Sequence, residues 1–151
     1  MRFSEYFYFV IRLIVGGVFM YSGFMKLIEP VAYFEASLAQ YSLIPVMSYS
    51  TIAFIVPWFE WILGVFFVVG YASRFSAKLI AAFLVIFLVL LASTIFSGGE
   101  APKDCGCFGE MGLKLNTKTV FALDLTLLIF TGLLLVINRF PFSIDRKLNK
   151  A

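Results

Sequence analysis

The sequence contains no histidine, and only 14% of its residues are charged. The absence of histidine excludes histidine metal sites, histidine-ligated haem and every catalytic triad or general base built on histidine. Charged residues make up about a quarter of an ordinary soluble domain, so this shortage excludes a polar, water-facing shell around a large core. The formal net charge of +3 gives no indication of a nucleic-acid partner.

Apolar residues replace the missing charge: 62% of the 151 residues are hydrophobic and 19% are aromatic. Four apolar stretches are each long enough to cross a hydrocarbon core of about 30 Å, because a helix rises about 1.5 Å per residue. They cover residues 6–28, 51–71, 76–96 and 117–138. The sequence therefore predicts an all-α membrane protein, with one domain over residues 1–151 built as a bundle of four transmembrane helices.

The distribution of lysine and arginine predicts the orientation of this bundle. Seven of them lie at the N-terminus, around the loop after the second span or in the tail: Arg2, Arg74, Lys78, Arg139, Arg146, Lys147 and Lys150. Four lie in or beside the other two loops: Lys26, Lys103, Lys114 and Lys118. We therefore expect a multi-pass protein of the cell inner membrane with both termini in the cytoplasm and residues 97–116 on the extracytoplasmic side.

The connection between the first two spans has a helical pattern. Phe34, Leu38 and Tyr41 recur at i, i+4 and i+7, which places them on one face of a helix. Pro30 suits the first helical position, and Pro45 follows the end of the pattern. We expect a short amphipathic helix at the outer interface, which either covers the end of the bundle or binds a partner.

Both cysteines of the chain lie in one loop, in the motif Cys105-Gly106-Cys107. A disulfide between positions i and i+2 closes a very small, strained ring, so it exchanges readily and gains little from loop closure. The intervening glycine relieves part of this strain. The pair is predicted to be a redox-active disulfide, with a zinc or copper(I) thiolate site and an inert staple as the alternatives.

Four charged side chains fall within the predicted spans: Arg12, Lys26, Glu60 and Asp124. Each is costly against lipid, so we expect them to face the bundle interior and to pair with one another. Depth along the spans predicts the pairs Arg12 with Glu60 and Lys26 with Asp124. Glu60 and Asp124 are candidate proton carriers for the thiol chemistry, or else polar contacts that fix the helix register.

Small and aromatic residues accompany these charges. Small residues on the first span allow close helix approach: Gly16, Gly17, Ser22 and Gly23. Pro57 is expected to kink the second span. Trp58 and Trp61 flank Glu60, and with Lys26 they form a candidate quinone-binding pocket, for which packing against lipid is the alternative.

Several segments, in their order along the chain, carry a family resemblance. They are Gly23-Phe24-Met25-Lys26-Leu27, Tyr41-Ser42-Leu43-Ile44-Pro45, Pro57-Trp58-Phe59-Glu60 with Gly64, Arg74, and Cys105-Gly106-Cys107-Phe108-Gly109. With this set the chain resembles the MauE branch of the DoxX-like superfamily. The resemblance implies a four-helix membrane bundle, loosely of the vitamin K epoxide reductase type. It also implies disulfide handling outside the cytoplasm with a thioredoxin-like partner, as in maturation of the disulfide-rich small subunit of methylamine dehydrogenase.

The chain departs from the vitamin K epoxide reductase pattern, because it has Cys-Gly-Cys in place of Cys-x-x-Cys and no second, shuttling cysteine pair. Electrons therefore need a partner thiol protein to reach the loop. We predict a membrane thiol–disulfide oxidoreductase in which Cys105 and Cys107 exchange disulfides with a thioredoxin-fold or exported protein, Glu60 and Asp124 move protons, and a quinone is the candidate electron acceptor. The alternative is a non-enzymatic scaffold or maturation factor for an exported redox enzyme. A small multidrug-type transporter is a weaker third, since it gives the cysteine loop no role.

Overall fold

The computed structural model describes residues 2–41, 44–96 and 115–137. The elements in this part of the chain are α1 (Arg2–Ile28), α2 (Val31–Leu38), the short 3-10 helix η1 (Val46–Ser48), α3 (Tyr49–Val69), α4 (Ser73–Phe96) and α5 (Thr117–Ile137). Helices α1, α3, α4 and α5 are long and apolar enough, by length and composition, to cross a membrane. The predicted architecture of four spans with a short helix between the first two is confirmed, and we treat the chain as a multi-pass membrane protein.

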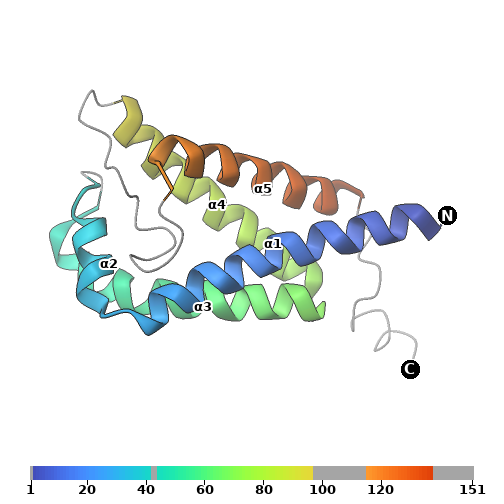
Figure 1. Ribbon diagram of the computed structural model, residues 1–151, viewed down its shortest axis with the longest axis horizontal. Helices are drawn as coiled ribbons and strands as arrows, with labels where there is room; N and C mark the ends of the chain where they lie inside the picture. Colours follow the sequence, from blue (N-terminus) through green and yellow to red (C-terminus); the bar gives the residue numbers. More distant parts are fainter. Residues whose placement is uncertain (1, 42–43, 97–114, 138–151) are drawn as a thin grey trace.

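The spans form two closely packed pairs. Helix α1 lies along α3, and α4 lies along α5, with successive spans running in opposite directions (Figure 1). Helix α2 packs on α3 at the end of the bundle away from the N-terminus, which we call the α2 end (Figure 1). Because α4 ends and α5 begins at the α2 end, the connection that contains both cysteines joins the bundle there.

Apolar side chains from all four spans meet along the centre of the bundle. The main buried cluster consists of Ile11, Val15, Phe19, Leu63, Phe67, Ala77, Ile80, Leu84, Leu127 and Leu134. The outward faces of the same helices are also apolar, since Phe54, Phe75 and Ile86 are each more than half exposed. An apolar surface around an apolar core is what four membrane-spanning helices require.

Glycine lets α1 and α3 approach each other at backbone distance. A Cβ added at Gly23 would lie 2.5 Å from the backbone nitrogen of Trp61 and 2.8 Å from the carbonyl oxygen of Pro57. A Cβ at Gly64 would lie 2.8 Å from the carbonyl oxygen of Gly16. The predicted role of small residues therefore holds for Gly16 and Gly23, and these contacts fix the register of α1 on α3.

A tight turn joins α3 to α4. Gly70 ends α3 in the left-handed conformation, with φ 79°, and its N–H donates to the carbonyl of Phe66 over 2.9 Å. The carbonyl of Ala72 then accepts from the N–H of Ser76, so α4 begins at Ser73, three residues before the predicted start. Helix α3 continues through Pro57 as one helical element.

The residues of the predicted amphipathic pattern are all buried. Phe34 and Leu38 lie on the face of α2 that packs against Ala53 of α3. Helix α2 ends at Leu38, and the following turn places Tyr41, only 3% exposed, against α4 and α5. Helix α2 and Tyr41, three residues beyond its end, therefore connect all four spans at the α2 end.

Candidate functional site

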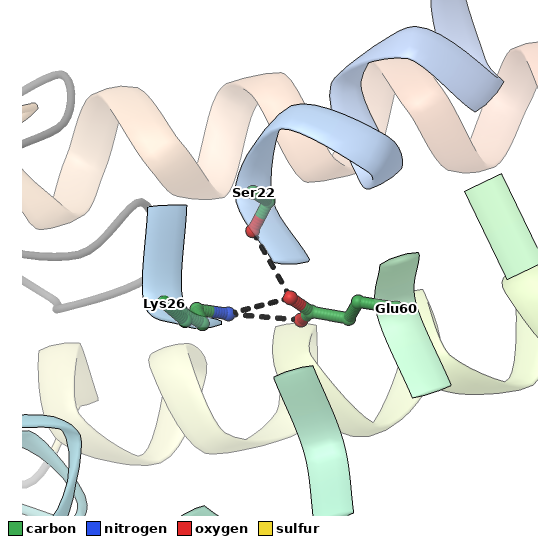
Figure 2. Close-up of polar contacts among 3 residues, drawn as sticks. All are labelled: Ser22, Lys26 and Glu60. Atoms are coloured by element: carbon green, nitrogen blue, oxygen red, sulfur yellow. Dashed lines mark hydrogen bonds and ion pairs between the residues drawn. The ribbon is translucent and has the colours of Figure 1, made fainter. Parts of the chain in front are cut away.

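A buried ion pair joins α1 to α3 near the α2 end. The Nζ atom of Lys26 lies 2.9 Å from Oε1 and 2.8 Å from Oε2 of Glu60, so the ammonium donates to both carboxylate oxygens. The hydroxyl of Ser22 donates to the same Oε2 over 3.1 Å. Figure 2 shows these three side chains converging between the helices. Glu60 therefore accepts three hydrogen bonds at a site shielded from solvent.

The register of the two helices explains this pairing. Ser22 precedes Gly23, the residue in backbone contact with α3 next to Trp61, so its hydroxyl lies level with Glu60. Lys26 is one turn further along the same face of α1. Since side chains on a helix lean toward its N-terminus, the lysine reaches back into the bundle to meet the carboxylate.

Arg12 does not pair with Glu60, and the predicted pair is wrong. Its guanidinium donates to the carbonyl of Val68 over 3.5 Å and lies 5.3 Å from the centre of the Phe9 ring. Val68 is eight residues beyond Glu60, which corresponds to about 12 Å along α3. Arg12, 1% exposed, thus lies in the opposite half of the α1–α3 contact. It is close to the C-terminal end of α3, where the helix dipole favours a positive charge.

Asp124 of α5 faces the ion pair across a small cavity. The cavity has a volume of about 30 Å³. Its polar lining comes from three helices: Ser22, Lys26, Glu60 and Asp124. Its apolar lining is Val18, Phe19, Phe83, Leu84, Phe87 and Leu127. Lys26 forms its ion pair with Glu60, so the predicted pairing of Lys26 with Asp124 is wrong. Lys26 and Asp124 instead line the same cavity.

Aromatic rings surround the ammonium of Lys26. Its Nζ atom lies 4.9 Å from the centre of the Phe34 ring and 5.4 Å from that of Phe87. Ring faces attract a cation, and the effect is larger where water is excluded. Because Lys26 and Glu60 are each only 4% exposed, removing either partner leaves an uncompensated charge in an apolar bundle.

The other predicted site residues lie elsewhere. Cys105 and Cys107 fall outside the described residues. Trp58 is 47% exposed on the outer face of α3, Trp61 is partly buried, and neither lines the cavity. Pockets for organic ligands measure about 300–1,000 Å³, so the cavity beside Lys26 does not accommodate a quinone ring, and a quinone site remains a prediction.

Ser22 is the site residue that sequence reasoning assigned to another role. It was expected to act only as a small residue in helix packing, yet its hydroxyl is a direct donor to the buried carboxylate. The available signal was its spacing of four residues from Lys26, which puts both polar groups on one face of an apolar helix.

Comparison with known proteins identifies a protein family. The family model described as methylamine utilisation protein MauE matches residues 4–138, which include all four spans, the buried polar residues and both cysteines. No curated protein and no solved structure matches.

Proposed function

The chain belongs to the MauE family, and from this membership we propose that it is a membrane protein of methylamine utilisation that exchanges disulfides through Cys105 and Cys107. The observation that carries the proposal is the position of the only two cysteines of the chain, which share one Cys-Gly-Cys motif inside the matched range. Such a closely spaced pair favours exchange over a stabilising role. The proposal also includes membership of the DoxX-like superfamily.

The proposed exchange runs through a mixed disulfide with the partner protein. The thiolate of one cysteine attacks a sulfur of the partner's disulfide, and the other partner sulfur leaves as a thiolate. The second cysteine then attacks the mixed disulfide, so that Cys105 and Cys107 become the disulfide and the partner becomes the dithiol. The reverse sequence donates a disulfide to the partner. Two electrons pass between the two proteins, and the partner supplies the oxidising or reducing equivalent.

The proposed setting follows from the charge distribution and the cysteine chemistry. The protein lies in the inner membrane with both termini in the cytoplasm, so the cysteine loop faces the compartment in which disulfides persist. The partner is a thioredoxin-fold protein or an exported disulfide-containing protein. Glu60 and Asp124 handle the protons that thiol chemistry releases and takes up.

Trapping of the mixed disulfide tests this proposal. The single variants Cys105→Ser and Cys107→Ser are expressed in membranes, and disulfide-linked adducts are separated on non-reducing gels. One of the two is expected to accumulate a covalent adduct with a partner, because its remaining cysteine attacks and no second thiol resolves the bond. The double variant is the matched control and is expected to form no adduct. Absence of adducts from both single variants, with normal disulfide status of exported proteins, overturns the exchange.

A second candidate function is a non-enzymatic scaffold or maturation factor for an exported redox enzyme. The observation that favours it is the outer face of α2, where Val31 is 42% and Tyr33 is 51% exposed beside the buried face that anchors the helix. Function that survives replacement of both cysteines but is lost in Tyr33→Glu supports the scaffold over the exchange.

A further inference from the structure

Two carboxyl groups line the polar cavity, and within the described part of the chain they differ in their hydrogen bonds. Glu60 accepts two bonds from Lys26 and one from Ser22. Asp124 is only 8% exposed and lines the cavity, yet no hydrogen bond to its carboxyl group comes from the part of the chain that the structure describes. A buried carboxyl group without a partner is costly in an apolar environment. Among the described residues, the cavity is therefore the space through which a partner can reach the carboxyl group of Asp124.

The size and lining of the cavity suit water. Its volume of about 30 Å³ exceeds the roughly 10–15 Å³ that one water molecule needs. A buried water needs two to four polar partners, about three as a rule, and Asp124, Glu60 and Ser22 supply oxygen atoms on the cavity wall. Helix α4 contributes only Phe83, Leu84 and Phe87, so no further charge enters from that side.

The charges around the cavity do not balance when every group is ionised. Lys26 contributes one positive charge, whereas Glu60 and Asp124 contribute one negative charge each. One added proton brings the cluster to neutrality, which an apolar bundle favours. Lys26 and Ser22 donate three hydrogen bonds to Glu60, whereas the described residues donate none to Asp124, so we place the added proton on Asp124.

We propose that this cavity is a buried binding site for internal water and one exchangeable proton, with the proton on Asp124 and water linking it to the Ser22–Lys26–Glu60 cluster. The site stands on geometry that is independent of the cysteines. Its use in thiol chemistry, as donor of this proton to a leaving thiolate and as acceptor only once that proton has gone, rests on the proposed function. Asp124 lies seven residues from the start of α5, about 10 Å along the helix, and α5 begins at the end where the cysteine connection enters.

Infrared difference spectroscopy tests the site directly. The full chain is reconstituted in lipid nanodiscs, and spectra are recorded across a pH titration in H₂O, D₂O and H₂¹⁸O. We expect a carboxylic-acid C=O band that shifts in D₂O, and a weakly bonded water O–H band that shifts in H₂¹⁸O. Asp124→Asn is expected to abolish the carboxylic-acid band, and Asp124→Glu to move its frequency while retaining the acid. The double variant Cys105→Ser/Cys107→Ser is expected to keep both bands.

The outcomes separate the two proposals. A carboxylic-acid band that is unchanged in both Asp124 variants, or absent from the wild-type spectra, overturns the proton site. A water O–H band that persists unchanged in both Asp124 variants overturns the link through water. If the Asp124 bands behave as expected while the cysteine variants trap no partner, the proton site stands and the disulfide exchange falls.

Discussion

Lys26 of α1 and Glu60 of α3 form a buried ion pair near the α2 end of the α1–α3 contact, with Nζ 2.8 Å and 2.9 Å from the two carboxylate oxygens. The pair joins two helices that also meet through close backbone packing, apolar side chains and the hydrogen bonds of Ser22 and Arg12. Since both groups are shielded from bulk solvent, each depends on the other for its charge compensation. The pair therefore fixes one register and one depth for the two helices.

Loss of the lysine is expected to destabilise the protein strongly. Lys26→Met leaves Glu60 as an uncompensated buried charge and should lower the free energy of unfolding by about 3–5 kcal/mol. The double variant Lys26→Met/Glu60→Met removes both charges and should recover most of this loss. Unfolding in mixed detergent micelles measures both values.

Lys78→Met is the matched control for this prediction, because Lys78 lies on the exposed face of α4. It should leave the free energy of unfolding nearly unchanged. An equal loss in Lys26→Met and Lys78→Met would contradict the structural role of the pair.

Removal of the serine hydroxyl is expected to weaken the same site. Ser22→Ala deletes the hydrogen bond to Oε2 of Glu60, and a bond to a charged group is worth about 1.5–3 kcal/mol. Ser37→Ala is the control, since its hydroxyl bonds the carbonyl of Tyr33 at an exposed position on α2. Comparable stability of the two alanine variants in the same unfolding assay would rule out the contribution assigned to Ser22.

The spans and the short helix were predictable because their signals are local. Four apolar stretches of sufficient length define α1, α3, α4 and α5, and the spacing of Phe34, Leu38 and Tyr41 defines the buried side of the α2 end. The location of the four charged side chains inside the bundle was equally predictable, since a charge facing lipid is costly.

The pairing of those charges was not predictable from depth along the spans. Depth places Arg12 and Glu60 at similar levels, but the backbone contact between Gly23 and Trp61 sets a register that brings Glu60 level with Ser22. The lysine side chain then spans about one further helical turn. Register and side-chain reach depend on contacts between helices, and no local pattern in a single sequence encodes them.

A methyl group at the closest helix contact is expected to separate α1 from α3. Gly23→Ala places a Cβ against backbone atoms of Trp61 and Pro57, which cannot move aside as a flexible side chain can. Overpacking of this kind costs about 1–3 kcal/mol, and the shift should also lengthen the Lys26–Glu60 pair.

Gly17→Ala provides the matched comparison on the same helix, because a Cβ there meets nothing within 4 Å. Its effect should be neutral or slightly stabilising, as alanine is a better helix former than glycine by about 1 kcal/mol. Equal destabilisation by the two alanines in thermal unfolding would show that helix packing at Gly23 is not the determining contact.

Two double-mutant cycles on Glu60 distinguish its true partner from the one that depth suggests. The first cycle combines Glu60→Gln with Lys26→Met, and the second combines Glu60→Gln with Arg12→Met. Direct contact in the first pair predicts a coupling free energy of about 1–3 kcal/mol. Arg12 instead contacts Val68, about 12 Å further along α3, so the second coupling should stay within about 0.5 kcal/mol although Arg12→Met alone is destabilising. Free energies of unfolding for all six proteins, including the wild type, supply both couplings. A larger coupling with Arg12 than with Lys26 would mean that α1 and α3 pack in a register that pairs Arg12 with Glu60.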